Sequence, residues 1–211
     1  MRIYTFFAHA MALITKVKAS LVNNLSDARY FSAAGVDWLG FCLDPEHPAF
    51  VVPEIVKEIA EWLHGIEVIG EFGNQTPDII ADTATQLQLE KMQIPVGLAA
   101  DERFREFKIF GVVDLEDSKI AEQYANVEFL VLRAAGKNWN QLSASEKEHI
   151  LEISERHQVL LDIPCAPPDY ENILKSYPIA GINIYGGNET EPGIGSFDDL
   201  DAVFEVLDPE F

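Results

Sequence analysis

Two chemically capable side chains in this sequence stand at the ends of short apolar runs. Arg133 ends the run Glu-Phe-Leu-Val-Leu, and Asp162 ends the run Val-Leu-Leu. A guanidinium stays charged at every relevant pH, so Arg133 can bind an anion but cannot donate a proton. The ends of neighbouring strands lie about 5 Å apart. The two residues either form a structural ion pair or orient a ligand, and the sequence leaves both roles open.

Lys18 and Ser20 form a second candidate group. They are two residues apart, so on an extended chain their side chains point to the same side. A lysine in a protein interior needs a carboxylate or a ligand, and Glu71 is the candidate carboxylate. Ser20 has no histidine near it in the sequence, and an unassisted hydroxyl is neither a base nor a nucleophile near neutral pH. The sequence favours a structural role for Ser20, as a small polar residue that bonds backbone or water.

Two glycines, Gly186 and Gly187, follow Tyr185. Consecutive glycines let backbone N–H groups approach a phosphate, which barrel enzymes often bind after strands seven and eight. The other half of such a phosphate site would come from the loop after the seventh strand. That loop, 162–169, has three prolines, two carboxylates and no glycine. Prolines supply no N–H group, and Asp162 would repel a phosphate dianion. A tight turn is therefore the favoured interpretation of the two glycines.

These residues must be positioned by eight repeats of an apolar run, a loop and an amphipathic segment. Each run is rich in Val, Ile, Leu or Phe, as is typical of parallel strands buried on both faces. Eight units in 211 residues fit a single α/β domain, a (β/α)8 TIM barrel, in which strand ends carry the chemistry and Asp114 joins the candidate residues. The expected strands are 15–20, 37–43, 66–72, 89–94, 107–113, 127–133, 158–163 and 180–185.

Capping signals predict where the helices begin. Thr76 followed by Pro77 is an N-cap with proline in the first turn. Residues 143–146 form a capping box that opens a helix to His157, and residues 196–199 resemble another. The segment 95–106 has weak helical signals, so the fourth helix is expected to be short or irregular.

Composition narrows the classes of ligand. The net charge is −20, and so acidic a surface repels phosphate backbones and anionic lipid, which argues against nucleic-acid and membrane-surface binding. The acidic surface also repels a small anionic substrate, unless positively charged residues at a local site outweigh this repulsion. No run of apolar residues is long enough to cross a membrane.

Cysteine and histidine spacing predicts no metal site and no cofactor. Cys42 and Cys165 are far apart, and the five histidines form no HxxxH pattern, so we expect reduced thiols in a cytoplasmic protein. The first residues are apolar after one positive charge, which is signal-like, but strand 15–20 follows almost at once. We expect residues 1–13 to be an N-terminal extension and 14–211 to form the barrel.

Residues 16–30 resemble the opening of phosphoribosylanthranilate isomerase, the (β/α)8 enzyme of tryptophan biosynthesis, whose first strand reads Val-Lys-Ile-Cys-Gly-Ile-Thr and leads into Asn-Leu-Glu-Asp-Ala. The likeness continues in order through residues 35–41, 70–74 and 136–139. These correspond to the family's Gly-Ala-Asp-Ala-Val-Gly-Phe, Gly-Val-Phe-Val-Asn and Gly-Lys-Thr-Phe. The resemblance implies the barrel fold over nearly the whole chain after residue 14.

The resemblance also implies that the active-site positions have changed. The family's general-base cysteine corresponds to Ser20, and its general-acid aspartate corresponds to Arg133. Its substrate-binding arginine corresponds to Ala49. The family's Gln-Leu-His-Gly motif corresponds to residues 93–96, which read Gln-Ile-Pro-Val. Its Ser-Gly-Gly phosphate loop corresponds to residues 162–165, which read Asp-Ile-Pro-Cys. Of the family's phosphate-binding residues, only Gly186 and Gly187 are kept.

The favoured hypothesis is an isomerase-like barrel without the isomerase activity, which binds or acts on a small neutral, cationic or zwitterionic ligand. Two alternatives stay open: an authentic isomerase with an altered acid–base pair, and a non-catalytic interaction protein with a plugged mouth. A monomer and a homodimer are equally consistent with the sequence. The expected mouth residues are Lys18, Ser20, Asp114, Arg133, Asp162 and Tyr185.

Overall fold

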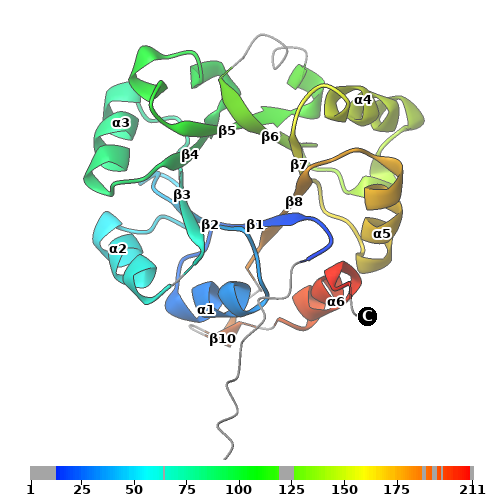
Figure 1. Ribbon diagram of the computed structural model, residues 1–211, viewed down its shortest axis with the longest axis horizontal. Coiled ribbons are helices and arrows are strands. Elements are labelled where there is room, and N and C mark those ends of the chain that lie inside the picture. Colours follow the sequence, from blue (N-terminus) through cyan, green and yellow to red (C-terminus); the bar gives the residue numbers. More distant parts are fainter. Residues whose placement is uncertain are drawn as a thin grey trace, which may run out of the picture.

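Eight parallel strands close into a barrel in the computed structural model, which confirms the predicted fold class (Figure 1). The structure describes residues 13–63, 65–118, 126–186, 189–191, 194–195 and 197–209. Every predicted strand is present, with its ends within two residues of the expected ones. The strands are β1 (Lys16–Ser20), β2 (Trp38–Cys42), β3 (Glu67–Glu71), β4 (Lys91–Pro95), β5 (Lys108–Asp114), β6 (Val127–Arg133), β7 (Val159–Asp162) and β8 (Gly181–Tyr185).

Helices surround the ring of strands in Figure 1. The connection from β4 to β5 holds two short 3-10 helices, η1 (Val96–Leu98) and η2 (Glu102–Phe104), which confirms the predicted irregular fourth helix. A third, η4 (Trp139–Gln141), follows β6. The α-helices are α1 (Leu25–Ala33), α2 (Pro53–Trp62), α3 (Pro77–Gln86), α4 (Ala144–Ser154), α5 (Pro167–Ser176) and α6 (Asp198–Leu207).

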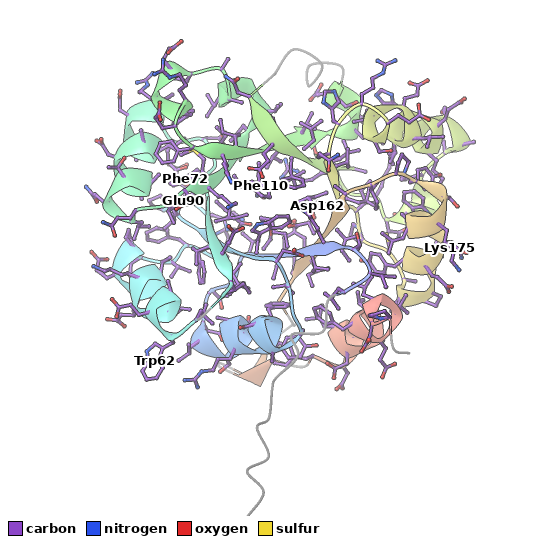
Figure 2. All side chains as sticks on the ribbon, in the orientation of Figure 1. Trp62, Phe72, Glu90, Phe110, Asp162 and Lys175 are labelled. Carbon is purple, nitrogen blue, oxygen red and sulfur yellow. The ribbon has the colours of Figure 1, made fainter. Side chains whose placement is uncertain are left out.

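An apolar cluster fills the amino-terminal part of the barrel interior. The Trp38 and Phe110 ring centroids are 5.2 Å apart, and those of Phe110 and Phe129 are 4.9 Å apart. Figure 2 shows Phe110 inside the ring of strands, while Trp62 and Lys175 project from the outer helices. Polar side chains lie on both sides of these rings: the Trp38 ring nitrogen donates to Glu67 at 2.8 Å, while Ser20, Glu71 and Asp162 end their strands. The cluster comprises Trp38, Ile69, Phe110, Phe129, Val131 and Leu160.

The register of the strands lines up their carboxyl ends at one rim. Ser20 is paired with Tyr185 across β1 and β8. Arg133 is paired with Asp114 on one side and with Asp162 on the other. Closure of the sheet therefore brings residues far apart in the sequence to one mouth, as expected for this fold.

The cap predictions have mixed outcomes. Ser143 caps α4 in a complete capping box with Glu146, as predicted. Thr76 is the N-cap of α3 and Pro77 opens the helix, as predicted, although the Thr76 side chain makes no cap hydrogen bond. Ser196, the first residue of the box predicted at 196–199, lies outside the described residues, and α6 begins at Asp198 after Phe197, which makes no side-chain cap hydrogen bond.

Two features near the chain ends complete the fold. A short antiparallel pair, β9 (Glu189–Glu191) and β10 (Ile194–Gly195), follows β8 and was not predicted. The Ile14 N–H donates to the Leu207 carbonyl at 2.9 Å, which ties the start of the barrel to the end of α6. The predicted extension lies outside the described residues except for residue 13.

The contrast between the two caps gives a test of the helix signals. Ser143→Ala removes a hydroxyl that accepts from the Glu146 N–H, so we expect it to lower the free energy of unfolding by about 1 kcal/mol. Thr76→Ala is the matched control, and we expect a much smaller loss because the hydroxyl caps nothing. Chemical denaturation of both variants measures the difference, and equal losses would contradict the assignment.

Candidate functional site

A cavity of about 570 Å³ opens among the strand ends and the loops that follow them. It brings together most of the predicted mouth residues, but Lys18 is not among its walls because that side chain is fully buried beneath them. The lining residues are Ser20, Leu21, Cys42, Asp44, His47, Glu71, Phe72, Gly73, Asn74, Gln93, Pro95, Val96, Gly97, Val112, Val113, Asp114, Asp117, Arg133, Asp162 and Tyr185.

A buried ion pair forms the floor of the cavity. The Lys18 ammonium contacts the Glu71 carboxylate, so the carboxylate suggested by the sequence is the one it meets. Lys18 is 0% exposed and Glu71 is 4% exposed. Gly40 on β2 leaves room for this pair, because a Cβ there would fall against Glu71 Oε1. Burial of both charges is tolerable only because each is hydrogen-bonded.

The remaining N–H groups of Lys18 are also used. One donates to Ser20 Oγ and another to Asn183 Oδ1 at 3.3 Å. The Ser20 hydroxyl has one proton, which goes to Glu71 Oε1 at 2.6 Å or to Asn183 Oδ1 at 2.7 Å. The sequence predicted that Ser20 bonds backbone or water, and the partners that its hydroxyl meets are the side chains of Lys18, Glu71 and Asn183.

Asp162 and Tyr185 lie on the cavity wall beside this floor. Asp162 Oδ1 accepts from Asn183 Nδ2 at 3.0 Å, and Oδ2 accepts from the Tyr185 hydroxyl at 2.7 Å. Burial raises the pKa of the Asp162 carboxyl above its usual value, against smaller opposing effects of these hydrogen bonds and of the charges on Lys18 and Arg133. Burial and the neighbouring Asp162 also raise the pKa of the Tyr185 phenol, so it stays a proton donor.

Arg133 contacts a different partner from the one considered in the sequence. Its Nη2 lies 3.3 Å from Asp114 Oδ2, and both side chains are partly exposed at the rim. No ion pair joins it to Asp162 among the described residues, so the suggested Arg133–Asp162 pair is wrong. Asp162 instead accepts from Asn183 and Tyr185, both on β8.

Carboxylates cover two glycines at the mouth. A Cβ on Gly186 would lie 2.7 Å from Asp27 Oδ2, and a Cβ on Gly73 would fall against Asp44 Oδ2. The space beside each of these two glycines is thus taken by a carboxylate oxygen and is not open to a ligand. Gly187 lies outside the described residues.

Sequence reasoning missed several members of this site. Asn183 bridges the Lys18 ammonium and the Asp162 carboxylate, and its position two residues before Tyr185 was the available signal. Cys42 and His47 line the cavity from β2 and its following loop. Burial raises the pKa of the Cys42 thiol, against a hydrogen bond to the Asp44 carbonyl and with help from the Glu71 and Asp44 carboxylates, so the thiol stays protonated near neutral pH.

A serine–histidine contact elsewhere does not form a nucleophilic site. Ser118 Oγ lies 2.6 Å from His149 Nε2, but the hydroxyl is buried and donates to the Leu115 carbonyl at 2.7 Å. The hydroxyl has one proton for these two acceptors, and its burial keeps it away from any substrate. Within the described part of the chain, no three metal-ligating side chains converge, and no helix is long and apolar enough to span a membrane.

Comparison with known proteins identifies the relatives of this chain. N-(5'-phosphoribosyl)anthranilate isomerase from Geobacter sulfurreducens is 26% identical over 187 residues, which cover 85% of this chain and 92% of the relative. The enzyme of that name from Thermotoga maritima is 29% identical over 125 residues, covering 56% and 61%. Over most of its length the chain is similar to phosphoribosylanthranilate isomerases. No family model matches it.

Solved isomerase structures share the fold. Phosphoribosyl anthranilate isomerase from Thermus thermophilus superposes with a TM-score of 0.75 at 24% identity, covering 91% of this chain and 98% of that one. The Thermotoga maritima isomerase gives a TM-score of 0.75 at 21% identity, covering 92% and 98%. At these identities the likeness establishes the (β/α)8 architecture, and the chemistry must be argued from the mouth itself.

The floor of the site is testable by a mutant cycle. Glu71→Leu leaves the Lys18 ammonium buried without an anion, so we expect it to lower the free energy of unfolding by about 3–5 kcal/mol. The double variant Lys18→Met/Glu71→Leu replaces both charges with apolar groups, and we expect it to recover most of that loss. Urea denaturation measures each variant. A double variant as unstable as the sum of both single variants would contradict a direct, buried pair.

Proposed function

We propose that this protein is a phosphoribosylanthranilate isomerase-like barrel that does not catalyse the isomerisation and binds a small, non-phosphorylated ligand at its mouth. The observation that carries the proposal is the state of Ser20, which occupies the position that corresponds by resemblance to the family's general base. Its hydroxyl is 2% exposed and is held among Lys18, Glu71 and Asn183. A hydroxyl that accepts from an ammonium is a very weak base.

The position that corresponds to the general acid supports the same conclusion. An Amadori rearrangement needs an acid to open the ribose ring and a base to remove the C2 proton. Arg133 holds the acid position, and a guanidinium does not release its proton near neutral pH. General acid–base catalysis contributes about 10²–10⁴-fold per group, so losing both groups removes most of the rate enhancement.

Among the residues that the structure describes, the loops after β7 and β8 offer little to a phosphate group. Asp27 lies against Gly186, and the segment after β7 leads through Pro164 into a helix that opens with Pro167 and Pro168. These prolines withdraw the N–H groups that would cradle a phosphate, and the Asp162 carboxylate adds negative charge beside them. A phosphorylated substrate would lose binding energy that this class of enzyme needs in its transition state.

An open cavity favours ligand binding over a plugged mouth. About 570 Å³ falls in the usual range for small-molecule sites. The Arg133–Asp162 pair that would have helped to fill the mouth is not formed, since Arg133 turns to Asp114. The authentic isomerase is the second candidate, and the 26% identity to the Geobacter enzyme over most of both chains favours it.

Turnover of phosphoribosylanthranilate by the purified protein, followed as loss of substrate fluorescence, tests the proposal. We expect no wild-type turnover, and a gain in the double variant Arg133→Asp/Ser20→Cys, which places an acid and a thiol at the two positions. The matched control is Arg105→Asp/Ser145→Cys, which makes the same changes at exposed residues and should gain nothing.

Each result of this assay has a definite meaning. Wild-type turnover would contradict the proposal and establish the authentic isomerase. No wild-type turnover with a gain in the double variant supports a scaffold that lacks its acid and base. No turnover in either protein agrees with the absence of isomerase activity but contradicts the expected gain, and it would identify the missing phosphate cradle as a further barrier.

A further inference from the structure

The mouth cavity is lined by more negatively charged than positively charged side chains. Arg133 is its one lysine or arginine among the described residues, and this cation lies against Asp114. Lys18 neutralises Glu71 from below. Neither Asp44 nor Asp162 has a described lysine or arginine within ion-pair distance. The carboxylates of the lining are Asp44, Glu71, Asp114, Asp117 and Asp162.

Asp162 is a buried carboxylate that no cation contacts. It is 8% exposed, and its two hydrogen bonds come from the neutral groups of Asn183 and Tyr185. The charges on Lys18 and Arg133 act on it only from beyond contact distance, and a carboxylate removed from water without a cation in contact is costly. Figure 2 shows Asp162 within the ring of strands, where a molecule in the cavity can reach it.

A second acceptor in the cavity wall is also unsatisfied. Gln93 Oε1 is buried and has no hydrogen-bond partner among the described residues. Gln93 is paired in register with Glu71, so it stands at the level of the cavity floor. Buried acceptors without donors cost about 1–3 kcal/mol each. The Gln93 side chain lines the cavity, so a turn of its amide toward a ligand N–H group would remove that cost.

We propose that the cavity binds an organic ligand through a protonated amine, which Asp162 receives and Gln93 helps to orient. The proposal rests on the proposed ligand-binding function and names its ligand class. An ammonium supplies both the missing positive charge and several N–H donors. Phe72 and the partly exposed Tyr185 ring line the same space, which gives the organic part of the ligand aromatic surfaces.

A bare metal ion fits these groups less well than an amine. Divalent cations such as Ca²⁺ need about six or more oxygen ligands that converge on one point. No three carboxylate, histidine or cysteine side chains converge in this way among the residues that the structure describes. A single buried carboxylate with one amide oxygen on the wall suits a group that brings its own directed N–H bonds.

Three probes of equal size and different charge test the ligand class. Benzylamine is a cation at neutral pH, benzyl alcohol is neutral and benzoate is an anion. Each is titrated to about 20 mM into the ¹⁵N-labelled protein, and amide shifts near Asp162 and Tyr185 report occupancy of the mouth. We expect benzylamine to bind with a Kd at least about tenfold lower than benzyl alcohol, and benzoate not to bind.

Two variants assign the preference to a residue. Asp162→Asn keeps the size of the side chain and removes its charge, so we expect the benzylamine preference to fall at least about tenfold. Asp82→Asn makes the same charge change on the exposed face of α3, and we expect no effect. The wild-type comparison of the three probes holds even if Asp162→Asn does not fold.

The outcomes separate this proposal from the proposed function. Equal or tighter binding of benzyl alcohol or benzoate, unchanged benzylamine binding in Asp162→Asn, or binding of none of the probes would overturn the amine proposal. None of these results restores the isomerase activity, which is measured independently by substrate turnover. Wild-type turnover combined with a benzylamine preference would leave the amine site intact and overturn only the loss of isomerase activity.

Discussion

The buried Lys18–Glu71 ion pair is the constraint on which the mouth of this barrel depends. Two opposite charges almost without exposure can persist only if every donor and acceptor finds a partner. Gly40 leaves the space for the pair, and Ser20 and Asn183 take up the remaining bonds of the ammonium. The polar atoms of these side chains are therefore already used in bonds with one another, which leaves few of them to bind a ligand in the cavity.

The same network sets the polarity of the cavity above it. Asn183 directs its carbonyl oxygen to the Lys18 ammonium, so its amide nitrogen must face Asp162. Asp162 thereby receives neutral donors on both oxygens, while the positive charge of Lys18 stays with Glu71. Carboxylates beside Gly73 and Gly186 extend the negative field to the rim. A barrel related to enzymes of a phosphorylated substrate thus offers a mouth suited to positive charge.

Sequence alone predicted the barrel because its signals are local and repeated. Each strand is a short apolar run, and the eight runs need no knowledge of partners to be found. The site was only partly predictable, since register decides which side chains meet. Lys18 and Glu71 were matched correctly by the need of a buried lysine for an anion. Arg133 was matched to the wrong neighbour, because both Asp114 and Asp162 lie beside it in the sheet.

Other failures have equally specific causes. Asn183 was overlooked because an asparagine inside an apolar strand carries no charge, although it lies on the same face as Tyr185. Thr76 is the N-cap of α3, but its side chain makes no cap hydrogen bond, which its residue type does not reveal. The short β9–β10 pair was missed because its two glutamates and its glycine are poor strand formers.

The central claim is that Asp162 is a buried carboxylate whose missing partner is a cation. Titration of the ¹³C-labelled Asp162 carboxyl by NMR, without and with saturating benzylamine, tests it most directly. Burial raises the pKa of this group in the free protein, and a bound ammonium favours the charged form. The account predicts a pKa above the ordinary aspartate value in the free protein and a fall on binding. An ordinary pKa in the free protein, or no fall with benzylamine bound, would contradict it.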